Sequence, residues 1–249
     1  ADGTALAYRY LYGRQPTVIF LPGYMSDMAG GKATAVMQWA FETGQACLLL
    51  DYAGCGLSGG VFEHETLDSW CGDVLTVANV VTIGAKILVG SSMGGWLMLR
   101  AARDWQQRGI PHSLHGLVGM AAAPDFTDWG FTDAEKALIA TEGLLQTPND
   151  YGDTPTVTTR AFWQSGQDNL VLGTRIAMTC PVRLIHGQRD VDVPWEIALK
   201  LAAAIDSDDV RVALVKDGDH RLSRDQDIAL MLATIAELVH EYEQIGRTP

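Results

Sequence analysis

The fold is decided by residues 87–99, which read Ile87-Leu88-Val89-Gly90-Ser91-Ser92-Met93-Gly94-Gly95-Trp96-Leu97-Met98-Leu99. An apolar run, a cluster of small residues and an apolar run with helical spacing predict a buried strand, a tight turn and a helix. Residues 90–94 match G-x-S-x-G, in which a serine sits at a sharp strand-to-helix turn. The residues two before and two after that serine must be small, because larger side chains would collide across the turn. Ser92 meets this requirement, whereas its alternative, Ser91, has Val89 and Met93 at those positions.

Length and composition indicate one globular domain. The chain has 249 residues, of which 47% are hydrophobic and 19% charged, enough for a sizeable core. Its formal net charge of −12 disfavours nucleic acid and anionic membrane surfaces as partners. No signal peptide and no apolar run of membrane length is visible, so we expect no stable membrane insertion. Because the chain starts at Ala1, a leader removed before that residue stays open.

The cysteines bear on compartment and cofactors. The four are Cys47, Cys55, Cys71 and Cys180. They form neither a C-x-x-C motif nor a metal-binding spacing, which favours free thiols in a reducing compartment. We therefore expect a cytoplasmic protein that uses no metal and no cofactor, while the oligomeric state stays open.

Strand and helix patterns alternate along the rest of the chain. Apolar runs predict strands at residues 6–12, 17–21, 46–51, 86–91, 114–120, 182–186 and 210–215. Helical spacing predicts helices at residues 33–41, 66–81, 96–107, 195–205 and 224–242. Such alternation predicts a mostly parallel central sheet with helices on both faces. The first strand alternates in polarity and reads as the edge strand of a hairpin.

One segment, residues 125–179, interrupts the alternation. It contains no strong strand pattern, a predicted helix at residues 133–141, and the aromatic residues Phe126, Trp129, Phe131, Tyr151, Phe162 and Trp163. A long insertion after a strand is usually a binding segment or lid, and it leaves the edge at which open α/β sheets bind ligands. We expect one domain, residues 1–249, with this insertion as a small cap. The alternative is a surface excursion whose aromatic residues pack on the core.

A serine nucleophile needs a base, and in a fold of this kind the residues follow the order serine, acid, histidine. Among the six histidines, His220 lies in the loop after the last predicted strand and is the expected base. His64 precedes the serine, and His112 and His115 lie at the amino end of the strand predicted at residues 114–120, which is the wrong edge of the sheet. His186 ends a strand and is expected to be a polar group near the core; His240 lies within the last predicted helix.

The acid has several candidates. Asp190 leaves the strand at residues 182–186 and is preferred, with Asp192 as an acid at the start of the next helix. Asp125 and Asp128 follow the strand at residues 114–120 and are the rivals, because some hydrolases take their acid there. Asp217 and Asp219 flank His220 too closely to orient its ring.

A site for acyl transfer also needs donors for the developing oxyanion. We expect the backbone N–H groups of Met93, which follows the serine, and of Tyr24, in the loop after the strand at residues 17–21. Residues 54–59 spell G-x-G-x-x-G but do not open a helix directly, which argues against a dinucleotide site. Gly31-Lys32 lacks the glycine pattern of a phosphate-binding loop.

With these residues in place, the chain resembles the α/β-hydrolase superfamily over nearly its whole length. More narrowly, it is similar to the abhydrolase-domain family that includes a mitochondrial acyl-protein thioesterase, also described as an acyl-glucuronide esterase. The stretches that carry the resemblance are residues 21–28 with Gly31-Lys32-Ala33, residues 51–58, residues 88–99, His186-Gly187 through Asp190 to Trp195, and Asp219-His220-Arg221. The resemblance implies an α/β-hydrolase fold and places the catalytic roles on Ser92, Asp190 and His220.

The expected activity is therefore hydrolysis of carboxyl esters, acyl-thioesters or both through an acyl-enzyme. We expect a small-molecule or acylated substrate, with an apolar pocket to which Trp96, Trp129 and Trp163 contribute. Two alternatives stay open: a lactonase or C–C hydrolase on the same fold, and a non-catalytic protein that binds an apolar ligand or a partner.

Overall fold

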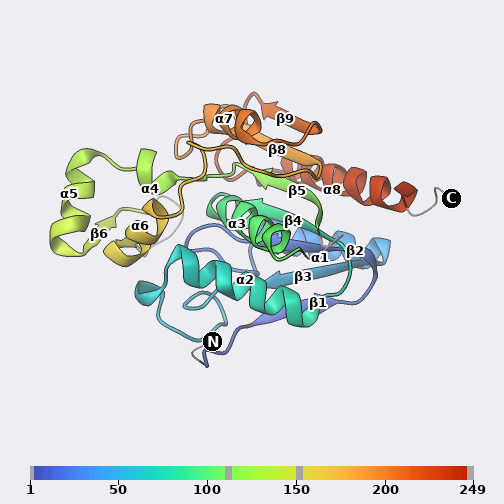
Figure 1. Ribbon diagram of the computed structural model, residues 1–249, viewed down its shortest axis with the longest axis horizontal. Helices are drawn as coiled ribbons and strands as arrows, with labels where there is room; N and C mark the ends of the chain where they lie inside the picture. Colours follow the sequence, from blue (N-terminus) through green and yellow to red (C-terminus); the bar gives the residue numbers. More distant parts are fainter. Residues whose placement is uncertain (1–2, 110–113, 150–153, 246–249) are drawn as a thin grey trace.

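The computed structural model describes residues 3–109, 114–149 and 154–245. Seven strands form one sheet in the order β1-β3-β2-β4-β5-β8-β9 (Figure 1). They are β1 (Tyr8–Leu11), β2 (Arg14–Leu21), β3 (Gln45–Leu50), β4 (Lys86–Ser91), β5 (Leu114–Met120), β8 (Val182–Gly187) and β9 (Val210–Val215). Only the β1–β3 pair is antiparallel among these neighbours. The predicted mostly parallel sheet is confirmed.

Helices cover both faces of this sheet. The core on one face includes residues of α1 (Gly31–Thr43) and α8 (Asp225–Ile245), and the core on the other includes residues of α2 (Leu67–Val81), α3 (Met93–Gln107) and α7 (Glu196–Ala204). In β2, Val18 and Phe20 join the first core, whereas Ile19 and Leu21 join the second. Successive side chains of a strand point to opposite faces, so a buried strand must be apolar throughout.

The first strand differs from its prediction. β1 is an edge strand, as expected, but it forms no hairpin with β2; it pairs with β3, with Tyr8 opposite Leu50. The reason is that β2 already has parallel partners on both sides, with Val18 opposite Cys47 and Ile87. No hydrogen-bonding edge of β2 is left for β1.

The insertion, residues 125–179, has more regular structure than predicted. It contains α4 (Phe126–Trp129), α5 (Asp133–Glu142), α6 (Arg160–Gln167) and an antiparallel pair of short strands, β6 (Leu144–Thr147) and β7 (Thr156–Thr159). Its labelled elements gather at one side of the molecule, at the left of Figure 1. α5 matches the predicted helix. The strand pair and the eight-residue helix α6 were not predicted, because elements of four to eight residues carry little periodic signal. Tyr151 and His112 lie outside the described residues.

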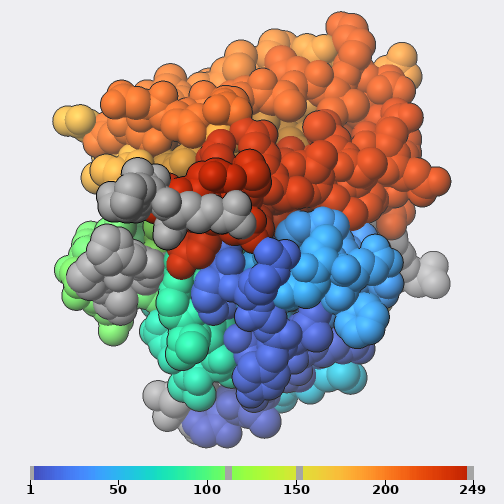
Figure 2. Space-filling view, turned by 90° about the vertical axis from the view of Figure 1, so that its right-hand side faces the viewer, coloured from blue at the N-terminus to red at the C-terminus, as the bar shows by residue number. Residues whose placement is uncertain are grey.

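Helix α8, near the C-terminus, packs against N-terminal segments of the chain. Viewed from the side opposite the insertion, its red segment lies against the blue N-terminal segments and the orange β8–β9 region (Figure 2). Arg14, at the start of β2, forms an ion pair with Glu243 near the end of this helix. Helices α1 and α8 therefore cover the same face of the sheet.

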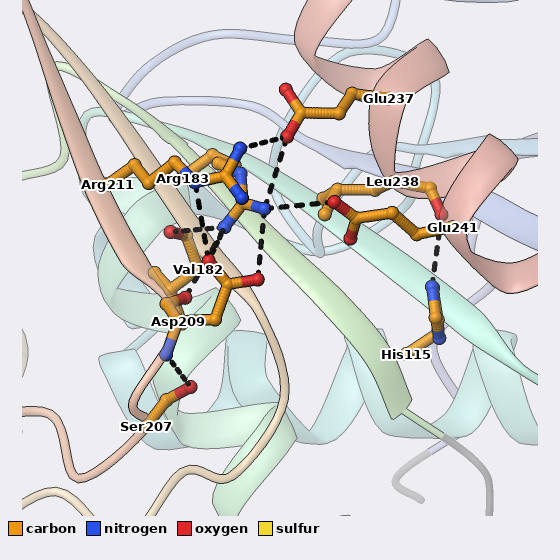
Figure 3. Close-up of polar contacts among 9 residues, drawn as sticks. All are labelled: His115, Val182, Arg183, Ser207, Asp209, Arg211, Glu237, Leu238 and Glu241. Carbon is orange, nitrogen blue, oxygen red and sulfur yellow. Dashed lines mark hydrogen bonds and ion pairs between the residues drawn. The ribbon is translucent and has the colours of Figure 1, made fainter.

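A charged network fixes β8 and β9 to α8 at the amino end of β8 (Figure 3). The Arg183 side chain is 3% exposed, and its guanidinium donates to both Asp209 carboxylate oxygens at 2.9 and 3.0 Å. It also reaches Glu237 at 3.2 Å and Glu241 at 3.3 Å. The guanidinium is buried but its carboxylate partners are about a third exposed, so solvent screens these pairs and removing one carboxylate should cost less than the roughly 3–5 kcal/mol typical of a fully buried pair. The network thus holds the end of the sheet opposite the candidate site.

Candidate active site

Ser92 occupies the turn between β4 and α3 with a strained backbone, φ 53° and ψ −121°. A Cβ atom added at Gly90 would lie 2.4 Å from the Gly94 carbonyl oxygen, and one at Gly94 would lie 2.1 Å from the Leu21 oxygen. Real Cβ atoms do not approach so closely, so both positions require glycine. The small residues of the motif are therefore explained by contact across the turn.

The imidazole of His220 links the serine to an acid. Its Nε2 lies 3.1 Å from Ser92 Oγ, and its Nδ1 lies 2.8 Å from Asp190 Oδ2. With Nδ1 as the donor to the carboxylate, Nε2 can accept the serine proton. The structure thus joins the three residues proposed from the sequence in one hydrogen-bonded chain, and it joins Ser92, not Ser91.

Two loops at the carboxyl end of the sheet carry the acid and the base. The N–H of Arg189 donates to the Gly218 carbonyl at 2.8 Å, and the N–H of Gln188 donates to Val215 at 2.9 Å. A Cβ atom at Gly187 would lie 2.3 Å from the Gly218 oxygen, so this approach depends on glycine. The loops after β8 and β9 are consequently held side by side, which brings Asp190 against His220.

Asp190 is placed as an ionised acceptor. Its side chain is fully buried, and its Oδ1 accepts the N–H groups of Asp192 at 3.0 Å and Val193 at 2.8 Å. Burial alone would raise the pKa of this carboxyl, but hydrogen bonds from His186 and His220 outweigh it and hold the pKa well below its usual range. Asp190 is therefore charged at every pH at which the protein would normally be assayed.

The rival acids lie elsewhere. Asp125 accepts the N–H groups of Val171 and Leu172, at the point where the insertion returns to the domain. Asp128 lies 3.8 Å from the ammonium of Lys136. These two carboxylates have structural partners within the insertion, and the hydrogen bond to His220 is made by Asp190.

Of the two residues expected to supply oxyanion donors, Met93 follows Ser92 directly and Tyr24 lies in a loop that approaches it. Met93 is the first residue of α3, so its backbone N–H has no partner within the helix. A Cβ atom at Gly23 would lie 3.3 Å from Ser92 Cβ, which brings the loop containing Tyr24 close to the serine. The Tyr24 hydroxyl donates to the carbonyl of Val157 in the insertion, so this loop is tied to β7.

A cavity of about 460 Å³ opens onto Ser92 and His220. Tyr24 and Pro22 line one part of it, and its lining also includes Asn149 and Thr156 from the insertion. The described lining does not include Trp96, Trp129 or Trp163. This cavity does not support the expectation that the three tryptophans form the substrate pocket, which stays a prediction.

The tryptophans have structural partners instead. Trp96 is completely buried, and its indole N–H donates to the Asn169 carbonyl. The indole N–H of Trp129 donates to Pro124, and that of Trp163 donates to Thr127. Trp96 is packed in the core, whereas Trp129 and Trp163 are half-buried. Helical spacing and aromatic content could not distinguish packing on the core from the wall of a cavity.

Sequence reasoning missed two residues near the triad. Lys32 lines the cavity, and its ammonium donates to the carbonyl of Arg221, which follows the expected base. Burial, aided by the Arg221 guanidinium, lowers the pKa of Lys32 to about 8. His186 Nε2 lies 3.1 Å from Asp190 Oδ2. The only signal was their place in stretches that resemble the hydrolase family, since no local spacing predicts contacts across loops.

One group of described side chains has ligand atoms close enough to hold a cation. Asp190, Asp192 and His220 place such atoms within 4.8 Å of one another. Asp190 already accepts donors on both oxygens, including His220 Nδ1. A cation there would have to displace the hydrogen bond that orients the imidazole, so the donor set suits a proton relay.

Comparison with known proteins agrees with this geometry. No protein-family model matches the chain. Palmitoyl-protein thioesterase ABHD10, mitochondrial, from Homo sapiens is 36% identical over 244 residues, which cover 96% of this chain and 78% of that protein.

Two solved structures are also similar along their length. A putative hydrolase from Agrobacterium vitis S4 superposes with a TM-score of 0.91 at 38% identity, covering 96% of this chain and 95% of that one. Alpha/beta hydrolase domain-containing protein 10 from mouse superposes with a TM-score of 0.88 at 37% identity, covering 97% and 96%. The chain therefore belongs to the ABHD10 family of α/β hydrolases and is an ester or thioester hydrolase.

Proposed function

We propose that this chain hydrolyses acyl esters and thioesters by nucleophilic catalysis, with Ser92, His220 and Asp190 as the triad. The single observation that carries the proposal is the hydrogen-bonded chain from Ser92 Oγ through the imidazole to a buried carboxylate, beside an open cavity. A serine hydroxyl is a weak nucleophile, and this arrangement supplies the base and the group that orients it.

The first half of the reaction forms an acyl-enzyme. Ser92 Oγ attacks the carbonyl carbon while its proton passes to His220 Nε2. The oxyanion accepts hydrogen bonds from the backbone N–H groups of Tyr24 and Met93. The tetrahedral intermediate collapses, its bond to the leaving oxygen or sulfur breaks, and the imidazolium returns the proton to that leaving atom.

The second half uses water as the nucleophile. His220 Nε2 takes a proton from water as the water oxygen attacks the acyl carbon of the ester at Ser92. Collapse releases the carboxylic acid, and the proton returns to Ser92 Oγ. Asp190 stays ionised throughout and stabilises the imidazolium without taking its proton, in keeping with its lowered pKa.

For the substrate we propose an acyl group carried by a thiol or alcohol, with the insertion acting as a cap over the site. The relatives are named palmitoyl-protein thioesterases, which favours an acylated protein or small molecule. Two insertion residues, Asn149 and Thr156, contribute to the cavity wall, as a cap requires. Chain length and leaving group are questions for a substrate panel.

The location of the protein is a separate prediction. The relatives are named as mitochondrial proteins, whereas the cysteine usage of this chain led us to expect the cytoplasm, and that expectation stays a prediction. Among residues 3–109, 114–149 and 154–245, no helix is both long and apolar enough to cross a membrane.

The test compares two adjacent serines. Ser92→Ala should lower kcat on p-nitrophenyl esters and acyl-thioesters by on the order of 10⁴-fold or more, because no other residue supplies the nucleophile. Ser91→Ala should still react with a fluorophosphonate probe, whereas Ser92→Ala should not. Full turnover by folded Ser92→Ala would end the proposal. If the wild type turned over only lactones or substrates cleaved at a C–C bond, the triad would catalyse one of those reactions instead of acyl ester or thioester hydrolysis.

A further inference from the structure

Three hydrogen bonds hold the Asp190 carboxylate, and a second imidazole, from outside the triad, lies against it. Oδ1 accepts two backbone N–H groups from its own loop. Oδ2 accepts His220 Nδ1 at 2.8 Å and also lies 3.1 Å from His186 Nε2. The two imidazoles therefore meet on the same oxygen, the one that orients the base.

The surroundings of His186 show which of its ring nitrogens donates a hydrogen bond. It is completely buried in β8, and Nε2 also lies 3.0 Å from the carbonyl oxygen of Val193. A carbonyl oxygen can only accept, so Nε2 carries the proton. Nδ1 is buried and has no hydrogen-bond partner among the described residues; a proton there would be an unpaired donor. The Nε2–H of His186 therefore donates to Val193, and Asp190 Oδ2 lies 3.1 Å from the same nitrogen.

From this position His186 can affect the orientation and the basicity of the Asp190 carboxylate. The carboxylate of an aspartate rotates easily about its last torsion, and an imidazole held by strand β8 and lying 3.1 Å from Oδ2 limits that rotation. The same N–H withdraws electron density from the oxygen that His220 uses. It also ties Val193, at the end of the acid loop, back to the strand from which the loop departs.

We propose that His186 is a positioning residue for the reaction: its buried imidazole, 3.1 Å from Asp190 Oδ2, holds this carboxylate in the orientation that His220 requires and moderates the basicity of Oδ2. The proposal rests on the proposed function of the triad. Asp192, in the loop after β8, has a carboxylate oxygen within 4.8 Å of ligand atoms of Asp190 and His220, and Asp219 and Arg221 are the sequence neighbours of His220; all three stay unchanged in the variants proposed here.

The central variant is His186→Phe, which keeps the ring volume and removes the donor, and its rescue is His186→Gln, whose side-chain amide can donate from a similar distance. With a p-nitrophenyl ester, His186→Phe should lower kcat about tenfold or more with little change in KM, as expected for loss of a hydrogen bond to a charged group. The acid limb of the kcat/KM profile should move to higher pH by about half a unit, because a more basic carboxylate favours the imidazolium. His186→Gln should recover most of both effects.

Coupling and a matched control separate this role from packing. In an Asp190→Asn background, His186→Phe should have almost no further effect on kcat, since its action passes through that carboxylate. His115→Phe is the control: His115 Nε2 also lies 3.0 Å from a carbonyl oxygen, that of Leu238, but His115 lies at the start of β5, away from the triad. It should leave kcat and the acid limb unchanged.

Several results would overturn the proposal. These are unchanged kcat in folded His186→Phe, equal losses in the Phe and Gln variants with no movement of the acid limb, or additive losses with Asp190→Asn. If His186→Phe does not fold, His186→Asn replaces it, because the shorter amide does not reach Oδ2. Failure of the triad itself would appear separately, as full activity in Ser92→Ala.

Discussion

At the scale of single residues, the site depends on backbone contacts that leave no room for side chains. Ser92 adopts a positive φ, and Gly94 lies directly against the end of β2, where the Leu21 and Pro22 carbonyl oxygens would meet an added Cβ at 2.1 and 2.5 Å. These oxygens belong to backbone and cannot rotate away. A methyl group there must displace either the helix or the loop that contains Tyr24.

We therefore expect Gly94→Ala to destabilise the protein by about 2–4 kcal/mol and to reduce activity strongly, in the range known for overpacked core sites. Urea unfolding and ester hydrolysis measure both effects. The matched control is Gly72→Ala in α2, where nothing lies within 4 Å of the added Cβ. That variant should gain about 0.5–1 kcal/mol from helix propensity, and equal behaviour of the two variants would contradict the argument.

At the scale of elements, the insertion is attached to the domain by a carboxylate clamp. Asp125 lies at its start with a positive φ of 60°, and its oxygens accept the N–H groups of Val171 at 2.8 and 3.0 Å and of Leu172 at 2.7 Å. Burial raises the pKa of this carboxyl in spite of those donors. Asp125, which the sequence order allowed as a catalytic acid, therefore connects the start of the insertion to the segment where the insertion ends.

Asp125→Asn should lower stability by about 1–3 kcal/mol, because an amide group cannot replace a carboxylate toward two N–H donors. Its kcat should fall by no more than about tenfold from the wild-type value. Loss of a triad acid typically lowers kcat by roughly 10⁴-fold. Thermal melts and steady-state kinetics decide this. Asp128→Asn, on an exposed pair with Lys136, should change stability by less than about 1 kcal/mol. A loss of kcat near 10⁴-fold in Asp125→Asn would reinstate Asp125 as the acid.

At the scale of the whole molecule, the two cores on either face of the sheet enclose all four cysteines. Each is a free thiol and buried. Burial raises the pKa of Cys47, Cys55 and Cys180 to about 12 and that of Cys71 to about 11. The thiolate is the reactive form, so the fold suppresses both access and ionisation.

We expect iodoacetamide at pH 8 to modify none of the four cysteines in the folded protein and all four in urea, counted by mass spectrometry. Because the folded thiols ionise at higher pH than unfolded ones, their contribution to stability is present below about pH 8.5 and is lost as pH rises above that value. Rapid modification of any cysteine in the native state would contradict this prediction, because it would show that the thiol is accessible in the folded protein.

Much of the architecture and of the site could be predicted because the signals are local. A buried strand, a glycine turn and a helix are neighbours in sequence, so Gly90, Ser92 and Gly94 define the elbow by themselves. Chain order then limits which aspartate and histidine can follow. The hydrogen bonds from His220 to Ser92 and Asp190 join the residues that this order selects.

Contacts between distant segments were decided only by tertiary structure. The pairing of β1 with β3, the strand pair of the insertion, the burial of Trp96 and the approach of His186 to Asp190 all depend on which surfaces meet once the sheet is assembled. Periodicity tells a residue's face and its tendency to be buried, but it carries no information about which partner covers that face. The sequence therefore determined the elements and the reactive groups, whereas packing determined the walls of the cavity and the groups that hold the acid in place.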